Sequence, residues 1–359
     1  MANAFSEATC VYGAQIINKH LTAIAAEVDG VRAAEDIEYI HRMRVATRRM
    51  RSALVLFGEC IPKQEYKTIS REVGKVTRAL GEARDLDVQL EVLKEAAVQF
   101  NTPRFSPGIR RLDLRLSQRR NEAQAHVNAA MDLMIEDRLL ERIGKWAAPL
   151  LSNADSVYLY SPALYQLAFG GVKTRLDDLL THVPFIYDPQ NTSELHAMRI
   201  SAKRLRYTLE AFEDLYGPQI KPYISVTRKL QDLLGTLHDL DVWIAYIPEF
   251  IEEERGRIWG YFGNDRPLKR LIPGLEAFKL SRIAIRQDTY ADFIQEWDGI
   301  EQAETWEKLL RLINTPLDLE AAMRTLRTAQ MPSKVGPAPD VNTPASGSAS
   351  EAPVSETQD

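Results

Sequence analysis

The sequence predicts an all-α protein made of two tandem four-helix-bundle repeats related by a pseudo-twofold axis. Three observations carry this prediction: a helical spacing of apolar residues, the lack of strand patterns, and an internal repeat. Apolar residues recur every three or four positions through most of the first 330 residues, which is the period of an amphipathic helix. Alternating runs of Val, Ile and Thr, which are typical of strands, are missing from this stretch.

The expected helices follow one another between prolines and glycines, which interrupt the helical period. The separating prolines, in chain order, are Pro62, Pro103, Pro107, Pro162, Pro184, Pro189, Pro218, Pro267 and Pro273. The expected helices span about residues 8–28, 37–59, 63–80, 84–100, 105–151, 162–182, 192–215, 219–235, 239–256, 267–299 and 301–314. Because their connections are short, neighbouring helices are expected to pack antiparallel, as in a bundle.

The internal repeat predicts how these helices are organised. The segment His41–Phe57 recurs as His196–Phe212, 155 residues later, with seven identities in 17 positions. The segment Leu80–Val88 recurs as Leu234–Val242, 154 residues later, with six identities in nine positions. Two matches at nearly one spacing indicate a tandem duplication. The two repeats are expected near 8–152 and 160–314.

A third match leaves its register open. Pro107-Gly108 matches Pro273-Gly274 at an offset of 166 residues. An offset of 167 instead aligns two pairs of arginines, Arg115 with Arg282 and Arg119 with Arg286.

Residues 331–359 differ in composition from the rest of the chain. They hold five prolines, no aromatic residue, and one lysine against four acids. Such a segment buries too little apolar surface to offset the entropy of ordering it. We therefore expect one folded domain over residues 1–330, followed by a disordered tail.

Several features indicate a reducing, cytoplasmic compartment. Only Cys10 and Cys60 occur, which predicts no disulfide framework. The N-terminus shows no basic segment followed by an apolar stretch, as a secretory signal would. The longest uncharged run, Ser156–Val172, falls short of the ~20 apolar residues of a membrane-spanning helix.

The net charge, taken as an average, argues against a polyanionic partner. The chain carries 45 Lys and Arg against 50 Asp and Glu, a net charge of −5. Acids and bases are segregated, however. Acids gather in stretches such as Glu252–Glu254, whereas bases gather on the helix that the chain contains twice.

This repeated helix presents one basic face and one apolar face. At 100° per residue, His41, Arg44, Arg48 and Arg51 share a face, opposite Met43, Met50, Leu54 and Phe57. The second copy places His196, Arg199, Lys203 and Arg206 in the same way, and Arg49 and Arg204 lie beside the two stripes. No acid interrupts either run before Glu59 and Glu210.

Like charges on one helix face cost stability unless an anion, or acids of neighbouring helices, neutralise them. Arginine also suits phosphate, because its planar fork bonds two oxygens at once. Further matched or periodic bases are Lys75, Arg111, Arg115, Arg119, Lys229, Lys279, Arg282 and Arg286. The pattern indicates a basic groove or pore for a linear polyanion. The alternative is that the arginines pair with Asp85, Asp87, Asp239 and Asp241.

At these residues the chain resembles the CHAD family, the histidine-bearing α-helical domains. That family carries two copies of a His-x-Met-Arg-(Val/Ile)-x-x-(Arg/Lys)-Arg-(Leu/Met)-Arg motif, each followed by a Leu-Gly-x-x-Arg-Asp-x-Asp-Val-like stretch. Both copies of the first motif are complete here, at His41–Arg51 and His196–Arg206. In the second motif, His238 replaces the arginine that the first half has as Arg84. The resemblance covers about residues 8–314.

The resemblance implies two four-helix bundles around a basic central channel that binds long-chain inorganic polyphosphate, often at polyphosphate granules. It implies as binding positions His41, Arg44, Arg48, Arg51, Lys75, His196, Arg199, Lys203, Arg206 and Lys229. The Glu-x-Glu-x-Lys motif of the triphosphate-tunnel domain, which some members add, does not occur, so the chain resembles the stand-alone form. We expect binding without catalysis and without a cofactor or metal.

Two other functions stay open. A metal-dependent His-Asp phosphohydrolase would use His196, His238, Asp239 and Asp241 as ligands. A nucleic-acid-binding protein would need aromatic residues among the basic stripes, and these helices offer few. Aromatic residues elsewhere, such as Trp259, Tyr261 and Phe262, are expected in the core or at an interface.

Overall fold

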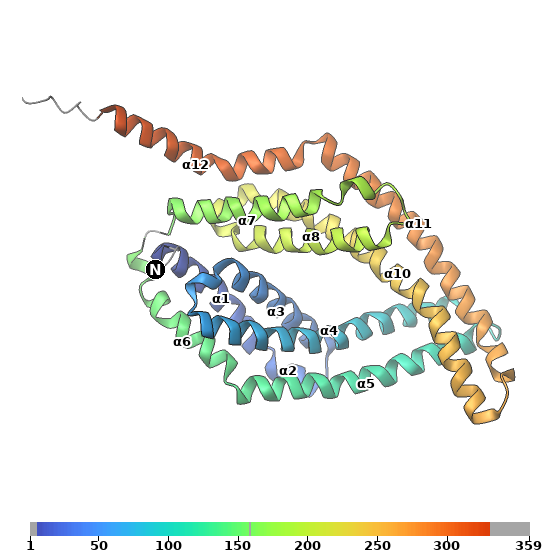
Figure 1. Cartoon of the computed structure of the whole chain (residues 1–359). Helices are drawn as coiled ribbons and strands as arrows, with labels where there is room; N and C mark the ends of the chain where they lie inside the picture. Colours follow the sequence, from blue (N-terminus) through green and yellow to red (C-terminus); the bar gives the residue numbers. More distant parts are fainter. Residues whose placement is uncertain (1–5, 158, 331–359) are drawn as a thin grey trace, which may run out of the picture. The chain divides into compact units, whose positions relative to one another are not determined.

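The computed structural model describes residues 6–157 and 159–330, and every regular element in them is a helix (Figure 1). The all-α prediction is confirmed. The expected disordered tail, 331–359, lies outside the described residues. The chain divides into two compact units, 1–317 and 318–359, and the contacts discussed below belong to the first.

The first half of the chain builds one layer of helices around α3. The elements are α1 (Glu7–Ala25), α2 (Val28–Ala33), α3 (Ile37–Phe57), η1 (Gly58–Cys60), α4 (Lys63–Gln99), α5 (Ser106–Glu136), α6 (Leu139–Ser152) and η2 (Ala154–Ser156). Ser6 and Asp36 cap α1 and α3, because their side chains accept hydrogen bonds from backbone amides of the first turn. Helix α3 packs against α1 and α4, and α4 packs along α5.

The second half repeats this order of contacts. The elements are α7 (Pro162–Leu180), η3 (Val183–Phe185), α8 (Thr192–Ala211), α9 (Glu213–Tyr216), η4 (Gly217–Ile220), α10 (Lys221–Phe262), η5 (Arg266–Arg270), α11 (Ile272–Gln302) and α12 (Thr305–Gln330). Helix α8 packs against α7 and α10, and α10 packs along α11. The halves meet where α3 contacts α8 and where α5 contacts α11.

The apolar stripes of α3 and α8 form the centre of the larger core. Their members are at most 1% exposed: Met43, Met50, Leu54, Phe57, Met198, Leu205, Leu209 and Phe212. The rings of Phe57 and Phe212 lie 5.9 Å apart between centroids. A second core cluster joins α4 and α5 to α10 and α11. Trp259, Tyr261 and Phe262 belong to neither cluster, because all three are exposed.

Helices α4 and α10 are continuous through the Leu-Gly motif, so the breaks expected near residues 81–83 and 236–238 are wrong. Glycine inside a helix costs about 1 kcal/mol relative to alanine, but here it makes room for an arginine. A Cβ on Gly81 would lie 3.8 Å from Arg44 Nε, and one on Gly235 would lie 3.6 Å from Arg199 Nε.

The single helix expected over 105–151 is also wrong, because the chain breaks between α5 and α6. Arg138 adopts the left-handed conformation there, with φ of 49°. No proline or glycine marks this break, which is why the sequence pattern did not reveal it.

The close contact between α5 and α11 settles the register of the third match. A Cβ on Gly108 would collide with the Leu271 carbonyl oxygen, and a Cβ on Gly274 would collide with that of Phe105. An offset of 166 residues converts one contact into the other, because it relates Gly108 to Gly274 and Phe105 to Leu271. The same offset relates Arg120 to Arg286. Arg120 donates to Asp87, and Arg286 donates to the matching Asp241. The alternative offset of 167 is therefore wrong.

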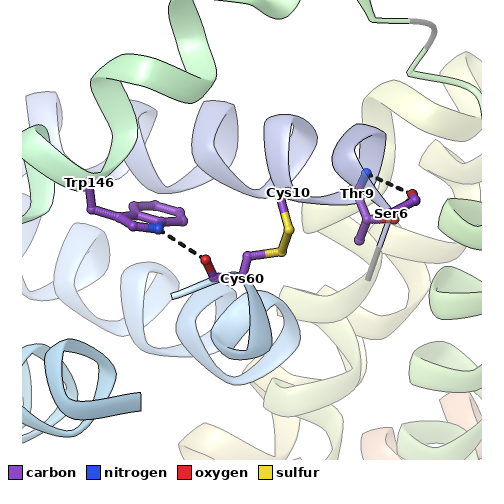
Figure 2. The surroundings of a disulfide bond; sticks show 5 residues. All are labelled: Ser6, Thr9, Cys10, Cys60 and Trp146. Atoms are coloured by element: carbon purple, nitrogen blue, oxygen red, sulfur yellow. Dashed lines mark hydrogen bonds between the residues drawn. A yellow bond between two sulfur atoms is a disulfide. The ribbon is translucent and has the colours of Figure 1, made fainter. Parts of the chain in front are cut away.

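Cys10 and Cys60 form a disulfide between α1 and the end of η1 (Figure 2). Their Cα atoms lie 5.3 Å apart although 50 residues separate them in sequence. Beside the bond, Trp146 of α6 donates its indole N–H to the Cys60 carbonyl oxygen at 3.1 Å. The sequence prediction of no disulfide is therefore wrong, because counting cysteines gives no information on which helices meet.

Candidate functional site

The basic faces of α3 and α8 come together where the two helices cross. Each helix turns its apolar stripe into the core, so that the opposite face, with its run of cations, borders solvent-accessible space. The two sets of cations then affect one another. Burial first, and then the charges of Arg44, Arg199 and Arg206, lower the pKa of Arg48. We call Arg44, Arg48, Arg199, Lys203 and Arg206 the central cations.

Lys203 shows most clearly that these charges are crowded. Burial and the charges of Arg48, Arg199 and Arg44 lower its pKa to about 8. No carboxylate within 4.0 Å of the amine relieves this repulsion among the described residues, because no ion pair of Lys203 is found there. Among the described residues, Lys203 therefore adds a positive charge that no carboxylate within 4.0 Å neutralises.

Tyr207 of α8 supports two of the central cations. The guanidinium carbons of Arg48 and Arg206 lie 5.6 Å and 5.0 Å from the centroid of its ring. A tyrosine ring attracts a cation through its electron-rich face. Tyr207 thus brings an arginine from each half close to one point without adding a negative charge.

A pocket of about 440 Å³ opens between α3, α7 and α8. Its cationic lining consists of Arg48, Arg51, Arg175, Lys203 and Arg204, and its other lining residues are Ser52, Val55, Leu56, Ile200, Tyr207 and Thr208. No carboxylate lines it. Arg175 is the one of these cations that was absent from the sequence prediction, and it donates to Asp178 at 3.1 Å.

The histidines of the two motifs lie beside the second-motif residue of their own half. Burial and the charge of Arg84 lower the pKa of His41, and Arg84 Nη1 is buried without a hydrogen-bond partner in the described structure. His196 Nδ1 lies 2.9 Å from His238 Nδ1. Burial, Arg199 and His196 lower the pKa of His238 to about 4, so this pair is mostly neutral at pH 7.

The alternative prediction, that acids of neighbouring helices neutralise the arginines, is partly correct. Arg44 of α3 forms an ion pair with Asp85 of α4, at 3.0 Å. Asp87 and Asp241 pair instead with Arg120 and Arg286, outside the two motif helices. These acids leave the five cations of the pocket without a carboxylate in its lining.

Arg49 lies on a different side of the α3–α8 contact. Its Nε donates to Glu210 Oε2 at 2.9 Å, and Arg206 Nε lies 3.8 Å from the other oxygen of Glu210. The carboxylate thus ties Arg49 of the first half to α8 of the second. The structure gives Arg49 a bridging contact and does not bring it into the pocket.

The remaining predicted binding positions form two groups. One group lies near the motif helices, and the other lies near the C-terminal end of α10. Lys75 pairs with Glu72 at 2.9 Å, and Lys229 pairs with Glu296. Both lysines are exposed on α4 and α10 and can still approach an anion. Arg282 lies over the Phe278 ring, 4.8 Å from its centroid.

Arg115 and Arg119 are engaged away from the central cations. Arg115 Nε donates to the fully buried Glu254 at 2.7 Å, and Arg119 donates to Glu253 and Tyr246. Since Arg120 matches Arg286, the register left open by the sequence is the one in which Arg115 and Arg119 do not correspond to Arg282 and Arg286. Arg115 and Arg119 hold α5 against α10.

The four residues considered for metal binding do not converge. Asp241 is taken by Arg286, and His196 and His238 face each other through their Nδ1 atoms. Across residues 6–157 and 159–330, no group of three or more His, Cys, Asp or Glu side chains is arranged to hold a metal ion.

Comparison with known proteins agrees with this geometry. A family model described as the CHAD domain matches residues 15–248. The chain belongs to the CHAD domain family. Two uncharacterized proteins from strains of Mycobacterium tuberculosis are 27% identical to this CHAD protein over 194 residues, which is 50% of this chain and 35% of each relative. The chain thus matches about a third of the length of those relatives.

Solved structures share the fold of this CHAD protein. The crystal structure of the CHAD domain from the plant Ricinus communis superposes with a TM-score of 0.57, at 22% identity, over 80% of this chain and 90% of that one. PptA from Streptomyces chartreusis gives 0.54 at 19% identity, over 79% and 98%. Within the part of the chain that the structure describes, no helix is long and apolar enough to cross a membrane.

Sequence reasoning missed three residues that lie in or beside this candidate site. Arg84 was visible in the second motif but was not included among the binding positions. Tyr207 follows the first motif in one half only, where the other half has Ser52, so the repeat gave no signal for it. Arg175 comes from α7, which carries no motif, and only the packing of α7 on α8 reveals it.

Proposed function

We propose that this CHAD protein binds inorganic polyphosphate without catalysis, through the central cations and the pocket beside them. One observation carries the proposal. Five cations line a pocket with no carboxylate in its lining. Burial and the charges of Arg48, Arg199 and Arg44 lower the pKa of one of the five, Lys203, to about 8. An anion bound to such a cluster is attracted by the cations and also offsets the repulsion of the cations for one another. The cluster therefore favours a ligand with several closely spaced negative charges.

Polyphosphate fits this site better than a nucleic acid duplex does. Each phosphate of the chain carries a charge, and the chain is thin and flexible enough to follow cations across α3, α7 and α8. Arginine forks can each bond two phosphate oxygens. The whole protein carries a net charge of −5, so the basic pocket would draw in a slender polyanion while the rest of the surface disfavours a broad one.

The bases on α4 and α10 extend the proposed path beyond the pocket. Lys75 and Lys229 occupy matching positions in the two halves, and both stay exposed while paired with an acid. A phosphate chain can approach the two amines, whose side chains are 46% and 64% exposed, while their partners Glu72 and Glu296 stay largely covered. Such a path through both halves, the basic channel expected from the family resemblance, would suit long chains and attachment to polyphosphate granules.

The test is fluorescence anisotropy with labelled polyphosphate over a range of salt concentrations. Binding releases condensed counterions, so log affinity should fall steeply and linearly with log salt. Arg48→Glu with Lys203→Glu should abolish binding, because both side chains line the pocket. The matched control is Lys145→Glu with Lys308→Glu, which makes the same charge change on α6 and α12.

Two outcomes would contradict the proposal. Affinity that hardly changes with salt would show that ion pairing does not drive binding. Equal loss of binding in the pocket variant and the control variant would show that net charge, and not the pocket, is responsible. Circular dichroism of each variant checks that helix content is unchanged. Release of phosphate from the polymer would show catalysis.

A further inference from the structure

A second surface, at the junction of α10 and α11, combines exposed aromatic rings with unpaired cations. Trp259, Tyr261 and Phe262 in the last turn of α10 are 60%, 83% and 56% exposed. Leu114 of the neighbouring α5 is 49% exposed. Gly263, with φ of 66°, ends α10 directly after these rings. Large apolar side chains gathered on a surface in this way mark an interaction site.

The cations around these rings lack acids. Arg110, Arg266, Lys269 and Arg270 are exposed, and none has a carboxylate within 4.0 Å among the described residues. Of the acids nearby, buried Glu254 binds Arg111, Arg115 and Arg257, and exposed Asp265, which precedes Arg266 in sequence, lies within 4.0 Å of none of the four cations. We call these four cations, the three aromatic residues and Leu114 the tip.

Two adjoining hollows connect five of the eight residues of the tip. One is lined by Arg110, Leu114 and Arg270, together with Arg111, Pro107, Pro267 and Leu271. The other is lined by Tyr261 and Phe262, together with Arg111, Arg115, Arg257, Ile258 and Gly260. Arg111 borders both hollows. Tyr261 and Phe262 therefore adjoin Arg110, Leu114 and Arg270 through Arg111. Trp259, Arg266 and Lys269 line neither hollow and are assigned to the tip because they are exposed and close to these residues in sequence.

We propose that the tip docks onto an anionic lipid surface. Tryptophan and tyrosine rings favour the level of the lipid headgroups, where an apolar body and a polar edge are both accommodated. Each Lys or Arg near anionic lipids contributes about 1 kcal/mol. Four unpaired cations beside inserted rings provide both parts of a peripheral membrane anchor.

The charge of the tip argues against another copy of this chain as its partner. In a symmetric dimer through this surface, Arg110, Arg266, Lys269 and Arg270 would face their own copies, and like charges would repel. The three rings could also stack on bases, but Leu114, Pro107 and Pro267 add apolar surface that base stacking does not use. This apolar surface favours lipid, and binding of single-stranded RNA is an outcome of the test below. The tip shares no residue with the polyphosphate pocket, so this docking is independent of the proposed function.

The experiment measures binding of the full chain to phosphatidylcholine vesicles with and without phosphatidylglycerol. We expect co-sedimentation only with the anionic vesicles. Trp259 is a built-in reporter, because Trp243, Trp297 and Trp306 are buried and Trp146 is half-buried. Its emission should shift to the blue on binding and should be quenched by brominated lipids.

Variants then separate the tip from other surfaces. Arg110→Glu with Arg270→Glu should weaken vesicle binding at least about tenfold, since it reverses two charges near the lipid. Trp259→Ala should also weaken it, whereas Phe185→Ala, which removes another exposed ring, should not. The pocket variant Arg48→Glu with Lys203→Glu should lose polyphosphate but keep vesicle binding.

Three results would overturn the proposal. One is a lack of binding to anionic vesicles, or equal binding to neutral ones. Another is loss of vesicle binding in the pocket variant while the tip variants bind normally. The third is tighter binding of an RNA oligonucleotide than of vesicles, lost in the same tip variants, which would assign the tip to nucleic acid.

Discussion

His196 Nδ1 lies 2.9 Å from His238 Nδ1, in the place where the first half sets Arg84 beside His41. The two halves thus put different chemistry at matching positions. The arginine is charged at every physiological pH, whereas the histidine pair changes its charge with pH. We therefore expect the second half to add pH sensitivity to the proposed polyphosphate binding.

Polyphosphate affinity should rise as the pH falls below neutrality. In the free protein the pKa values of His41 and His196 are lowered, and that of His238 is about 4. Bound phosphate favours the protonated rings, so binding takes up protons and becomes tighter at lower pH. His238→Arg should raise the affinity at pH 7.5 about fivefold by adding one permanent charge, and should reduce the gain on acidification. Anisotropy titrations at several pH values test this, and an affinity of His238→Arg equal to that of the wild type throughout would contradict it.

The same histidines should make the unliganded protein less stable in acid. Their pKa values are lower in the folded state than the ordinary value of 6.5, so the unfolded chain binds more protons between about pH 6.5 and pH 4. Stability therefore falls as the pH decreases through this range. Saturating polyphosphate should reduce the fall, because the bound anion stabilises the protonated rings.

Lys203 should govern affinity on the alkaline side. Its pKa of about 8 in the free protein means that the amine loses its proton above that pH unless an anion restores it. Affinity should therefore decrease as the pH rises above about 8. Lys203→Arg should remove most of this decrease, because a guanidinium stays charged. The measurement is the slope of log affinity between pH 8 and pH 10, and identical slopes for both proteins would show that another group titrates.

The contact of α5 with α11 should tolerate no side chain at its glycines. Gly274→Ala places a Cβ against the Phe105 carbonyl oxygen, and separating the two helices should cost about 1–3 kcal/mol. The control is Gly170→Ala in α7, where a Cβ meets no atom within 4 Å and alanine should stabilise the helix by about 0.5–1 kcal/mol. Urea unfolding gives both values. Equal stability of the two variants would rule out close packing at this position.

Reduction of the disulfide should destabilise the first half. The bond joins residues 50 apart, and a loop of that length contributes about 4 kcal/mol through the entropy of the unfolded chain. Cys10→Ser with Cys60→Ser should therefore lower the unfolding midpoint, and a reductant should lower it in the wild type but not in the variant. If the reductant has no effect on the wild type, the cysteines are not paired in solution.

The local period and the repeat correctly predicted the all-α class and the two faces of the motif helices, although not every helix boundary. The stripes of α3 and α8 are buried on one side and cationic on the other, because burial and helix geometry alone decide which residues share a face. The duplicated motif also located the central cations. Local period and repetition could not predict contacts between helices that are distant in sequence. Examples are the disulfide between Cys10 and Cys60 and the ion pairs of Arg115 and Arg119 with α10.

Glycine was the residue most easily misinterpreted. Gly81 and Gly235 resembled helix ends, yet both lie inside long helices where an arginine crosses them. Gly108 and Gly274 carried the correct register, whereas the arginine spacing suggested a wrong one. In each case the purpose of the glycine is close approach by another segment, which local sequence does not reveal.

The paired contacts at α5 and α11 have the form of a homodimer interface. In a dimer of identical chains, residue i of one copy meets residue j of the other, and j meets i. Gly108 with Leu271 and Gly274 with Phe105 follow this rule within one polypeptide. A homodimer must carry every substitution twice, whereas a fused pair can change one side alone. This chain differs in this way at two pairs of matching positions, with His238 for Arg84 and Lys203 for Arg48. The two ends of its proposed polyphosphate site are therefore chemically unlike.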